Sequence, residues 1–268
     1  DTLSAYDSPS PTSAVKAISP YWLAAQPLSV TATATDLTDG VTAVELWYRF
    51  AADNATWGAW ANFGTLNAAP WSWNFTFPDG DGYYELYTRA SDAADNYESA
   101  PADADAICGY DTVNPTSSID AISPYWQTSS PINLSAQGSD SLSGLAYLDA
   151  WYRFAPDNAT WTAWIFIGSD PTAPYGGDFN FPNGNGYYEF YSRATDLAGN
   201  NEDIPATAGA LCAFDSDLPM SNVDAITPYW HTTMPLTATA TVTEALSGIT
   251  YVEFWYSHSA DNITFGAY

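Results

Sequence analysis

The sequence predicts an all-β protein made of tandem β-sandwich domains, and three observations lead to this fold class. First, residues 82–96, GYYELYTRASDAADN, alternate with period two, so that Tyr84 and Leu86 fall on one side of a strand and Tyr83 on the other. Second, the stretch returns at residues 186–200 as GYYEFYSRATDLAGN. Third, aromatic and β-branched residues are plentiful, and Pro and Gly interrupt them at short intervals. No amphipathic helical pattern and no apolar run long enough to cross a membrane accompanies them.

The repeat has a period of 104 residues, and no insertion interrupts it. About 100 residues make one sandwich domain. We therefore expect the last strand of a preceding repeat at 1–7, complete repeats at 8–111 and 112–215, and the first half of a third repeat at 216–268, as in a window cut from a longer array. The residues that show the period are Trp22, Trp126 and Trp230, Trp47, Trp151 and Trp255, and Cys108 and Cys212.

The second repeat shows about seven strands in order. Residues 145–155 alternate, with Leu148 and Tyr152 facing inward and Trp151 and Arg153 facing outward. Asp-Asn and Asn-Gly turns bound the strands, and Pro124 after a serine is a candidate cis bond. The remaining strands are expected at 115–122, 131–139, 160–168, around 175–182, from 186 onward, and at 207–214. Seven short strands with frequent turns are typical of an immunoglobulin-type sandwich.

The segments WYRFAPDNATWTAW, FPNGNGYYEFYSRATDLAGN and CAFDSDLP carry a resemblance to a known family. They resemble the tandem Ig-like (immunoglobulin/fibronectin-III-like) repeats of archaeal or bacterial cell-surface, S-layer-like and extracellular filament proteins. The resemblance extends over every repeat. It implies an extracellular or cell-surface location, and a place in a stalk, surface layer, adhesin or filament, or beside a catalytic domain.

Charge restricts the partners of the chain. It has 31 acidic and 5 basic residues and a net charge of −26. Nucleic acid is excluded, because phosphate binding needs basic patches, and direct membrane insertion is not expected. The predicted partners are copies of the chain itself, neighbouring surface proteins or glycans. Cys108 and Cys212 occupy equivalent places in successive domains, too far apart for a bridge, so we expect unpaired thiols that pack as small apolar residues, with a bridge to another chain as the alternative.

Catalytic patterns are missing from the sequence, and we predict that the protein is not an enzyme. The two histidines, His231 and His258, lie only in the third repeat, where we expect packed rings. Neither a Ser-His-Asp order nor a zinc spacing recurs. The predicted function is a non-enzymatic extracellular structural array such as a filament, surface layer or adhesin stalk. The alternative is a set of carbohydrate-binding modules attached to a secreted hydrolase, which a catalytic domain elsewhere in the reading frame would favour.

The outward face of two neighbouring strands carries aromatic and basic residues in both complete repeats. Guanidinium groups can stack on aromatic rings across strands. Two interpretations remain open, namely a ladder that stiffens each module and a lateral contact surface for a neighbouring chain or glycan. The residues are Trp47, Arg49, Tyr87, Arg89, Trp151, Arg153, Tyr191 and Arg193.

Five asparagines lie in Asn-x-Thr or Asn-x-Ser sequons, which predict glycosylation. Three of them follow an aspartate in the turn after the third strand, and Asp-Asn is a favourable turn without sugar. The five are Asn54, Asn74, Asn133, Asn158 and Asn262.

Acidic residues at the domain junctions predict a structural, interdomain Ca²⁺ site. In a sandwich of this type the loops after the second and sixth strands share the end at which the linker from the preceding domain arrives. Ca²⁺ takes six to eight oxygen ligands, which carboxylates, an amide and backbone carbonyls can supply. The alternative is that these acids cap turns and solvate the junction. The candidate sets are Asp7, Asp36, Asp92 and Asn96, then Asp111, Asp140, Asp196 and Asn200, and then Asp215 and Glu244.

Overall fold

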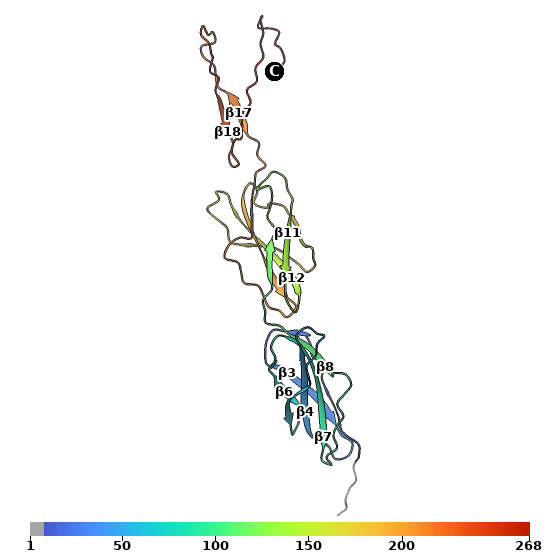
Figure 1. Cartoon of the computed structure of the whole chain (residues 1–268). Helices are drawn as coiled ribbons and strands as arrows, with labels where there is room; N and C mark the ends of the chain where they lie inside the picture. The colour runs from blue at the N-terminus through green and yellow to red at the C-terminus, as the bar shows by residue number, and fades with distance from the viewer. Residues whose placement is uncertain (1–7) are drawn as a thin grey trace, which may run out of the picture.

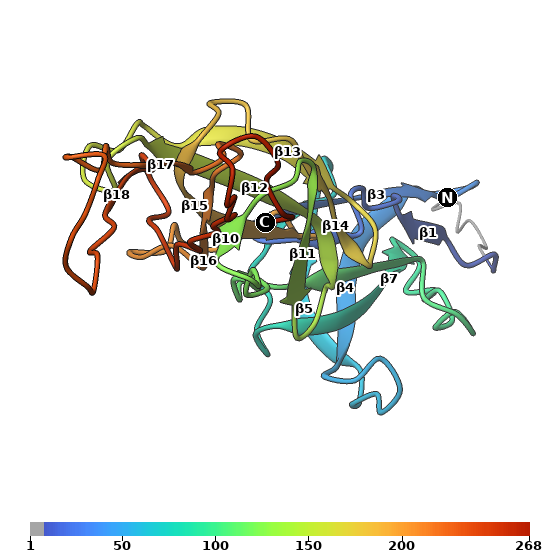
Figure 2. The ribbon, with the colours of Figure 1, turned by 90° about the horizontal axis from the view of Figure 1, so that it is seen from above.

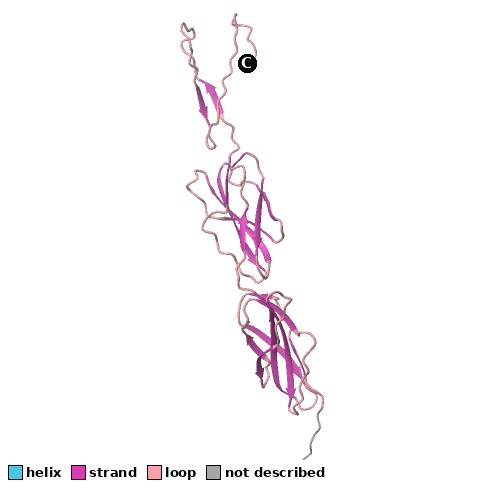
Figure 3. Cartoon of the chain, in the orientation of Figure 1, coloured by secondary structure: helices cyan, strands magenta, loops and turns pink. Residues whose placement is uncertain are grey.

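A computed structural model describes residues 8–268. Those residues form strands, turns and loops with no helix, so the predicted all-β fold class is confirmed (Figure 3). None of the described residues belongs to a helix that could cross a membrane. The repeats follow one another end to end as an elongated particle (Figure 1), and the view along its long axis shows them partly superposed in projection (Figure 2). The predicted strand at 1–7 lies outside the described residues.

The first repeat is a sandwich of two sheets. The five-stranded sheet has the order β2 (Trp22–Leu23), β8 (Ala106–Tyr110), β7 (Gly82–Asp92), β4 (Val41–Ala51) and β5 (Ala61–Leu66). The three-stranded sheet has the order β1 (Thr12–Val15), β3 (Leu28–Thr35) and β6 (Ser72–Phe75). The inward face of β7 carries Tyr84 and Leu86, both fully buried, as the period-two pattern predicts.

The second repeat has the same topology. Its larger sheet has the order β10 (Trp126–Gln127), β16 (Ala210–Phe214), β15 (Gly186–Asp196), β12 (Leu145–Ala155) and β13 (Ile165–Asp170). Its smaller sheet has the order β14 (Tyr175–Phe179), β11 (Ile132–Ser139) and β9 (Thr116–Ile119). Most neighbours are antiparallel, but β10 runs parallel to β16.

Several strands of the second repeat are shorter than predicted, among them β14, which ends at Phe179, and β16, which begins at Ala210. The first strand, predicted at 115–122, is confined to β9, and the unpredicted strand β10 follows it and joins the other sheet. The predicted cis bond at Ser123–Pro124 lies between β9 and β10. The fourth predicted strand begins at Ile165 instead of residue 160. The residues before it turn back, because the rings of Trp161 and Trp164 pack on the Arg153 guanidinium. The guanidinium carbon lies 5.0 and 4.7 Å from the two ring centroids.

Aromatic rings and small residues fill the core of each module. Phe75 and Tyr84 meet edge to face in the first repeat, with centroids 5.6 Å apart, and Phe179 and Tyr188 repeat the contact at 5.7 Å. The prediction for the thiols is confirmed, since Cys108 and Cys212 are unpaired and buried. Burial raises the pKa of both thiols to about 12, so neither is a reactive thiolate at neutral pH.

Residues 216–268 have one two-stranded sheet, formed by β17 (Met220–Val223) and β18 (Ala240–Thr243). Large apolar side chains are exposed here, among them Trp230 at 83% and Trp255 at 66%. The expectation that His231 and His258 are packed rings is wrong, because both are exposed where no second sheet covers them.

Candidate interdomain metal site

Three carboxylates from separate segments meet at the junction of the first and second repeats. Asp111 directly follows the strand β8 and opens the linker, Asp140 follows β11, and Asp196 is the last residue of β15. Each offers a carboxylate oxygen within 4.8 Å of the others. Asp111 and Asp196 are buried, at 0% and 2% exposure. Like charges this close repel one another by about 1 kcal/mol per pair even in water, so the cluster favours a cation.

Asp111 connects the two modules through its own hydrogen bonds. Its backbone N–H donates to the Leu23 carbonyl of the first repeat at 2.9 Å. Its Oδ2 accepts the Ser143 N–H of the second repeat at 3.0 Å, and its carbonyl accepts the Asn200 amide at 2.8 Å. One residue thus holds the end of one module against two loops of the next, which restricts bending at the linker.

Asp140 presents an unused oxygen to this cluster. Its Oδ1 accepts the backbone N–H groups of Leu142 and Gly144 at 3.0 and 2.7 Å. Its Oδ2 is buried and has no hydrogen-bond partner within residues 8–268. A buried acceptor without a donor is costly, and coordination to a cation would satisfy it. Carboxylate oxygens are the ligands that Ca²⁺ prefers, so the residues present fit this ion.

Asn200, predicted as an oxygen ligand, has a different place. Its Nδ2 donates to Asp196 Oδ2 and to the Asp111 carbonyl, each at 2.8 Å. Its backbone N–H donates to Asp196 Oδ1, also at 2.8 Å. The amide nitrogen therefore faces the acids in this arrangement, and Asn200 positions Asp196 and Asp111 instead of offering its side-chain oxygen.

The corresponding cluster of the first repeat contains Asp36, Asp39 and Asp92. Asp36 Oδ2 is a second buried acceptor without a partner among the described residues. The hydrogen bonds that Asp36 Oδ1 accepts from Thr38 and Gly40 hold the pKa of this carboxyl below its usual value. Asn96 donates to Asp92 Oδ2 at 2.8 Å, as Asn200 does to Asp196.

The remaining acids of the outer clusters differ in how they relate to the prediction. Asp7 lies outside the described residues. Asp39 was not predicted, because the second repeat has Ser143 at the matching position. In the third set, Asp215 Oδ2 accepts the Ser247 N–H at 3.2 Å, and Glu244 accepts the Leu246 N–H at 3.0 Å. The pKa of Asp215 is lowered, chiefly by its hydrogen bond with Ser247 and in smaller part by the hydrogen bond that it accepts from the Asp217 N–H.

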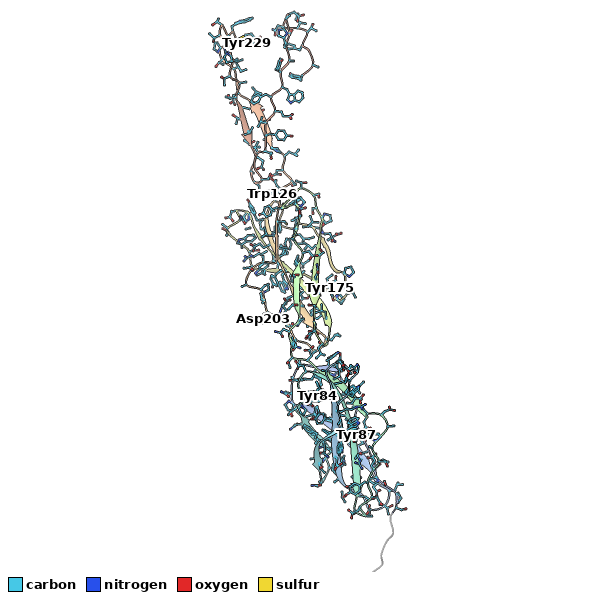
Figure 4. All side chains as sticks on the ribbon, viewed as in Figure 1. Tyr84, Tyr87, Trp126, Tyr175, Asp203 and Tyr229 are labelled. Carbon is cyan, nitrogen blue, oxygen red and sulfur yellow. The ribbon has the colours of Figure 1, made fainter. Side chains whose placement is uncertain are left out.

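The predicted aromatic face is largely covered by its own module. Tyr87 and Tyr191 are each only 5% exposed. Trp47 stacks on Tyr87 with centroids 6.1 Å apart, and Trp60 packs on the same ring edge to face at 4.4 Å. The tyrosines are thus covered within their own modules, which weighs against the lateral contact surface, one of the two interpretations of this face. Figure 4 places Tyr87 within the first module.

The four arginines of this face also have partners inside their modules. Arg49 forms an ion pair with Glu85 at 2.5 Å and lies between Trp57 and Trp60. Arg153 repeats this arrangement with Glu189, Trp161 and Trp164. Arg89 and Arg193 donate to the carbonyls of Glu98 and Glu202 at 3.0 and 2.7 Å. Of the two interpretations, these contacts favour the internal ladder.

Comparison with known proteins gives neighbours in structure. Neither a family model nor a curated protein sequence matches the chain. The fibronectin(III)-like modules of Clostridium thermocellum CbhA are 16% identical with a TM-score of 0.39, over 76% of this chain and 93% of that one. A tetra-tandem repeat in the extending region of a large adhesion protein is 16% identical with a TM-score of 0.30, over 81% of this chain and 52% of that one.

A third neighbour, α-2-macroglobulin from Escherichia coli, is 10% identical with a TM-score of 0.28, over 82% of this chain and 15% of that one. The chain thus spans about half of the adhesion-protein structure and a small part of the macroglobulin. At this level the similarity says nothing about function.

All five sequon asparagines are exposed. Asn54, Asn158 and Asn262 have positive φ angles of 54°, 56° and 56°, in turns where the preceding aspartate accepts backbone N–H groups. Asn74 and Asn133 lie on β6 and β11. The turn conformation alone explains asparagine at the first three positions, because asparagine tolerates positive φ.

Intact mass spectrometry of the native protein is expected to show added sugar mass, with peptide mapping assigning it to these asparagines. Exposure makes each position accessible to a transferase, and the sequon supplies the acceptor. Unmodified asparagine at all five positions would rule glycosylation out and leave Asn54, Asn158 and Asn262 as turn residues.

Proposed function

We propose that this chain is part of a non-enzymatic extracellular structural array, a filament, surface layer or adhesin stalk, in which interdomain Ca²⁺ stiffens the junctions. The observation that carries the proposal is the junction itself, where Asp111 hydrogen-bonds to both modules and shares an acidic cluster with Asp140 and Asp196. The same backbone contact recurs one repeat later, where Asp215 N–H donates to the Gln127 carbonyl at 2.9 Å. A repeated junction supports an extended rod of many modules.

The net charge of −26 supports an external setting. Such a field repels itself unless salt or divalent cations screen it. The partners that we propose are copies of the chain or neighbouring surface proteins. The carbohydrate-binding alternative gains little support from the aromatic face, because Tyr87 and Tyr191 at its centre are buried. A glycan array probed with the chain separates the two functions, and electron microscopy of the native material shows whether filaments or layers exist.

Removal of Ca²⁺ is expected to shorten the particle and lower its melting temperature. Ligand at about 100 times its dissociation constant contributes about 2.7 kcal/mol, which for a domain of this size corresponds to roughly 10 °C or more. Small-angle scattering and thermal unfolding of the chain, in Ca²⁺ and then in chelator, measure both effects. Length and melting temperature that do not respond to the chelator would contradict the calcium site.

The variant Asp140→Asn tests the same site without removing its turn. Asparagine keeps an oxygen acceptor for the Leu142 and Gly144 N–H groups. It replaces the unpartnered Oδ2 with an amide nitrogen and removes the negative charge of the carboxylate. We expect this variant to lose most of the Ca²⁺ response. Asp157→Asn is the matched control, because Asp157 accepts Ala159 and Thr160 N–H groups in an exposed turn away from the cluster. An equal loss in both variants would indicate a general charge effect.

A further inference from the structure

A pocket of about 150 Å³ lies between the two sheets of the second repeat. It is found at the side of the sandwich where β13 and β14 are edge strands of their sheets. Leu134, Leu148 and Ala150 are among the residues that line it, and Ile167 and Gly177 in its wall are exposed, so that the pocket opens to solvent. Another lining residue is Tyr175, the first residue of β14, which Figure 4 labels in the second module.

The first repeat fills the equivalent space with side chains. Trp73 and Leu46, which are 6% and 0% exposed, belong to its core. The residues 104 positions later are Gly177 and Ala150. The second repeat thus lacks an indole and most of a leucine side chain at adjoining positions of its two facing sheets.

Two glycines show that the vacated space remains open. A Cβ added at Gly64 of the first repeat would lie 3.9 Å from Trp73 Cδ1. A Cβ added at the equivalent Gly168 would meet no atom within 4 Å, and neither would one at Gly177. The surrounding strands therefore do not close over the missing side chain, and the module retains a cavity that its neighbour fills.

Three aspartates line this space, Asp149, Asp170 and Asp178, and Asp170 is the one that replaces an apolar residue of the first repeat. Asp170 takes the position of Leu66, which packs against the core of the first repeat. Its Oδ1 accepts the Thr172 N–H and its Oδ2 the Gly176 N–H, each at 3.0 Å. These hydrogen bonds lower the pKa of Asp170, with the Gly176 contribution the larger, so the group is charged at neutral pH. The residues that line the pocket include no Lys or Arg to neutralise it.

We propose that this pocket binds a small aromatic amine, with the ring in the space that Trp73 fills in the first repeat and the ammonium group against Asp170. An apolar cavity of about 150 Å³ is known to accept benzene, and this pocket extends to the surface, where a larger ring and its substituent can be placed. The negative field of the whole chain further favours a cation over a neutral or anionic ligand.

Titration of the chain with tryptamine, followed by methyl NMR, tests the proposal. We expect a dissociation constant on the order of 0.1–1 mM, with shifts confined to pocket methyl groups such as Ile167 and Leu148. Indole-3-propionate has the same ring and the opposite charge, and it should bind at least about tenfold more weakly. Unmoved pocket methyl groups, or equal affinity for both ligands, would overturn the proposal.

Two variants restore the residues of the first repeat. Gly177→Trp should abolish binding by filling the pocket, and Asp170→Leu should retain the ring site but reduce the preference for tryptamine, leaving only what the other acids of the chain contribute. Methyl signals of the first repeat, such as those of Val44, should be unchanged in both. If Gly177→Trp does not fold, Gly168→Leu fills the pocket from the opposite sheet, where its Cβ has room. Tryptamine binding that survives both filling variants would place the ligand elsewhere and refute the assignment.

Discussion

Replacing Trp73 with alanine is expected to lower the free energy of unfolding of the first repeat by about 3 kcal/mol. Removal of a buried tryptophan costs about 3–5 kcal/mol through lost transfer free energy and the cavity left behind. Trp73 is 6% exposed, and its Nε1 is buried without a hydrogen-bond partner among the described residues. Alanine also removes that unsatisfied donor, which places the cost at the lower end of the range.

Hydrogen exchange in the chain measures this effect module by module. Amides of β3 and β4 report opening of the first repeat, and amides of β11 and β12 in the second repeat are the internal reference, since distant modules contribute nearly independently. Trp73→Phe is the control variant, because it keeps an aromatic ring and deletes the unpaired N–H, so it should cost less than about 1 kcal/mol. Equal protection in Trp73→Ala and the original chain would show that the tryptophan does not support the core.

The strands were predictable from the sequence because one face of each is buried. Residues 145–155 were predicted as a strand from alternation, and β12 has those bounds. Alternation identifies which side chains share a face, but it does not show what covers that face. Tyr87 was therefore correctly placed outside the sandwich core. Trp47 stacks on it from the neighbouring strand β4, but the cover that Trp60 adds depends on how the β4–β5 connection folds back.

The acidic cluster was predictable in part because loop positions follow from the order of strands in a sandwich. Asp111, Asp140 and Asp196 do lie together, whereas the orientation of the Asn200 amide depends on local hydrogen bonds that spacing does not specify. Alignment of the two repeats could have indicated the pocket, because Gly177 occupies the position that Trp73 has in the first repeat. Neither residue is unusual alone, and only packing shows that no other side chain fills the space.

Replacing Glu202 with alanine is expected to cost the second repeat about 3 kcal/mol. Glu202 Oε1 accepts the Ser117 N–H on β9 at 2.9 Å, and Oε2 accepts the Ala194 N–H on β15 at 2.9 Å and the Ser117 hydroxyl at 2.5 Å. Strands β9 and β15 belong to opposite sheets, so one carboxylate ties the two layers together. Hydrogen bonds to charged groups contribute about 1.5–3 kcal/mol each, and alanine leaves two part-buried backbone donors without their acceptor.

The first repeat supplies a matched variant, because two carboxylates instead of one link its two sheets by hydrogen bonds. Glu98 makes the corresponding contacts with Ser13 and Ala90, and Asp105 additionally accepts the N–H groups of Val15 and Thr88, each at 3.0 Å. The second repeat has Gly209 in place of Asp105. Hydrogen exchange should therefore show strand β9 opening far more readily in Glu202→Ala than strand β1 opens in Glu98→Ala. Glu202→Gln, which keeps an acceptor oxygen but no charge, should fall between Glu202→Ala and the original chain. Equal responses of β1 and β9 would show that Asp105 does not help to hold β1. The contacts of Glu98 and Glu202 would then alone determine the stability of β1 and β9.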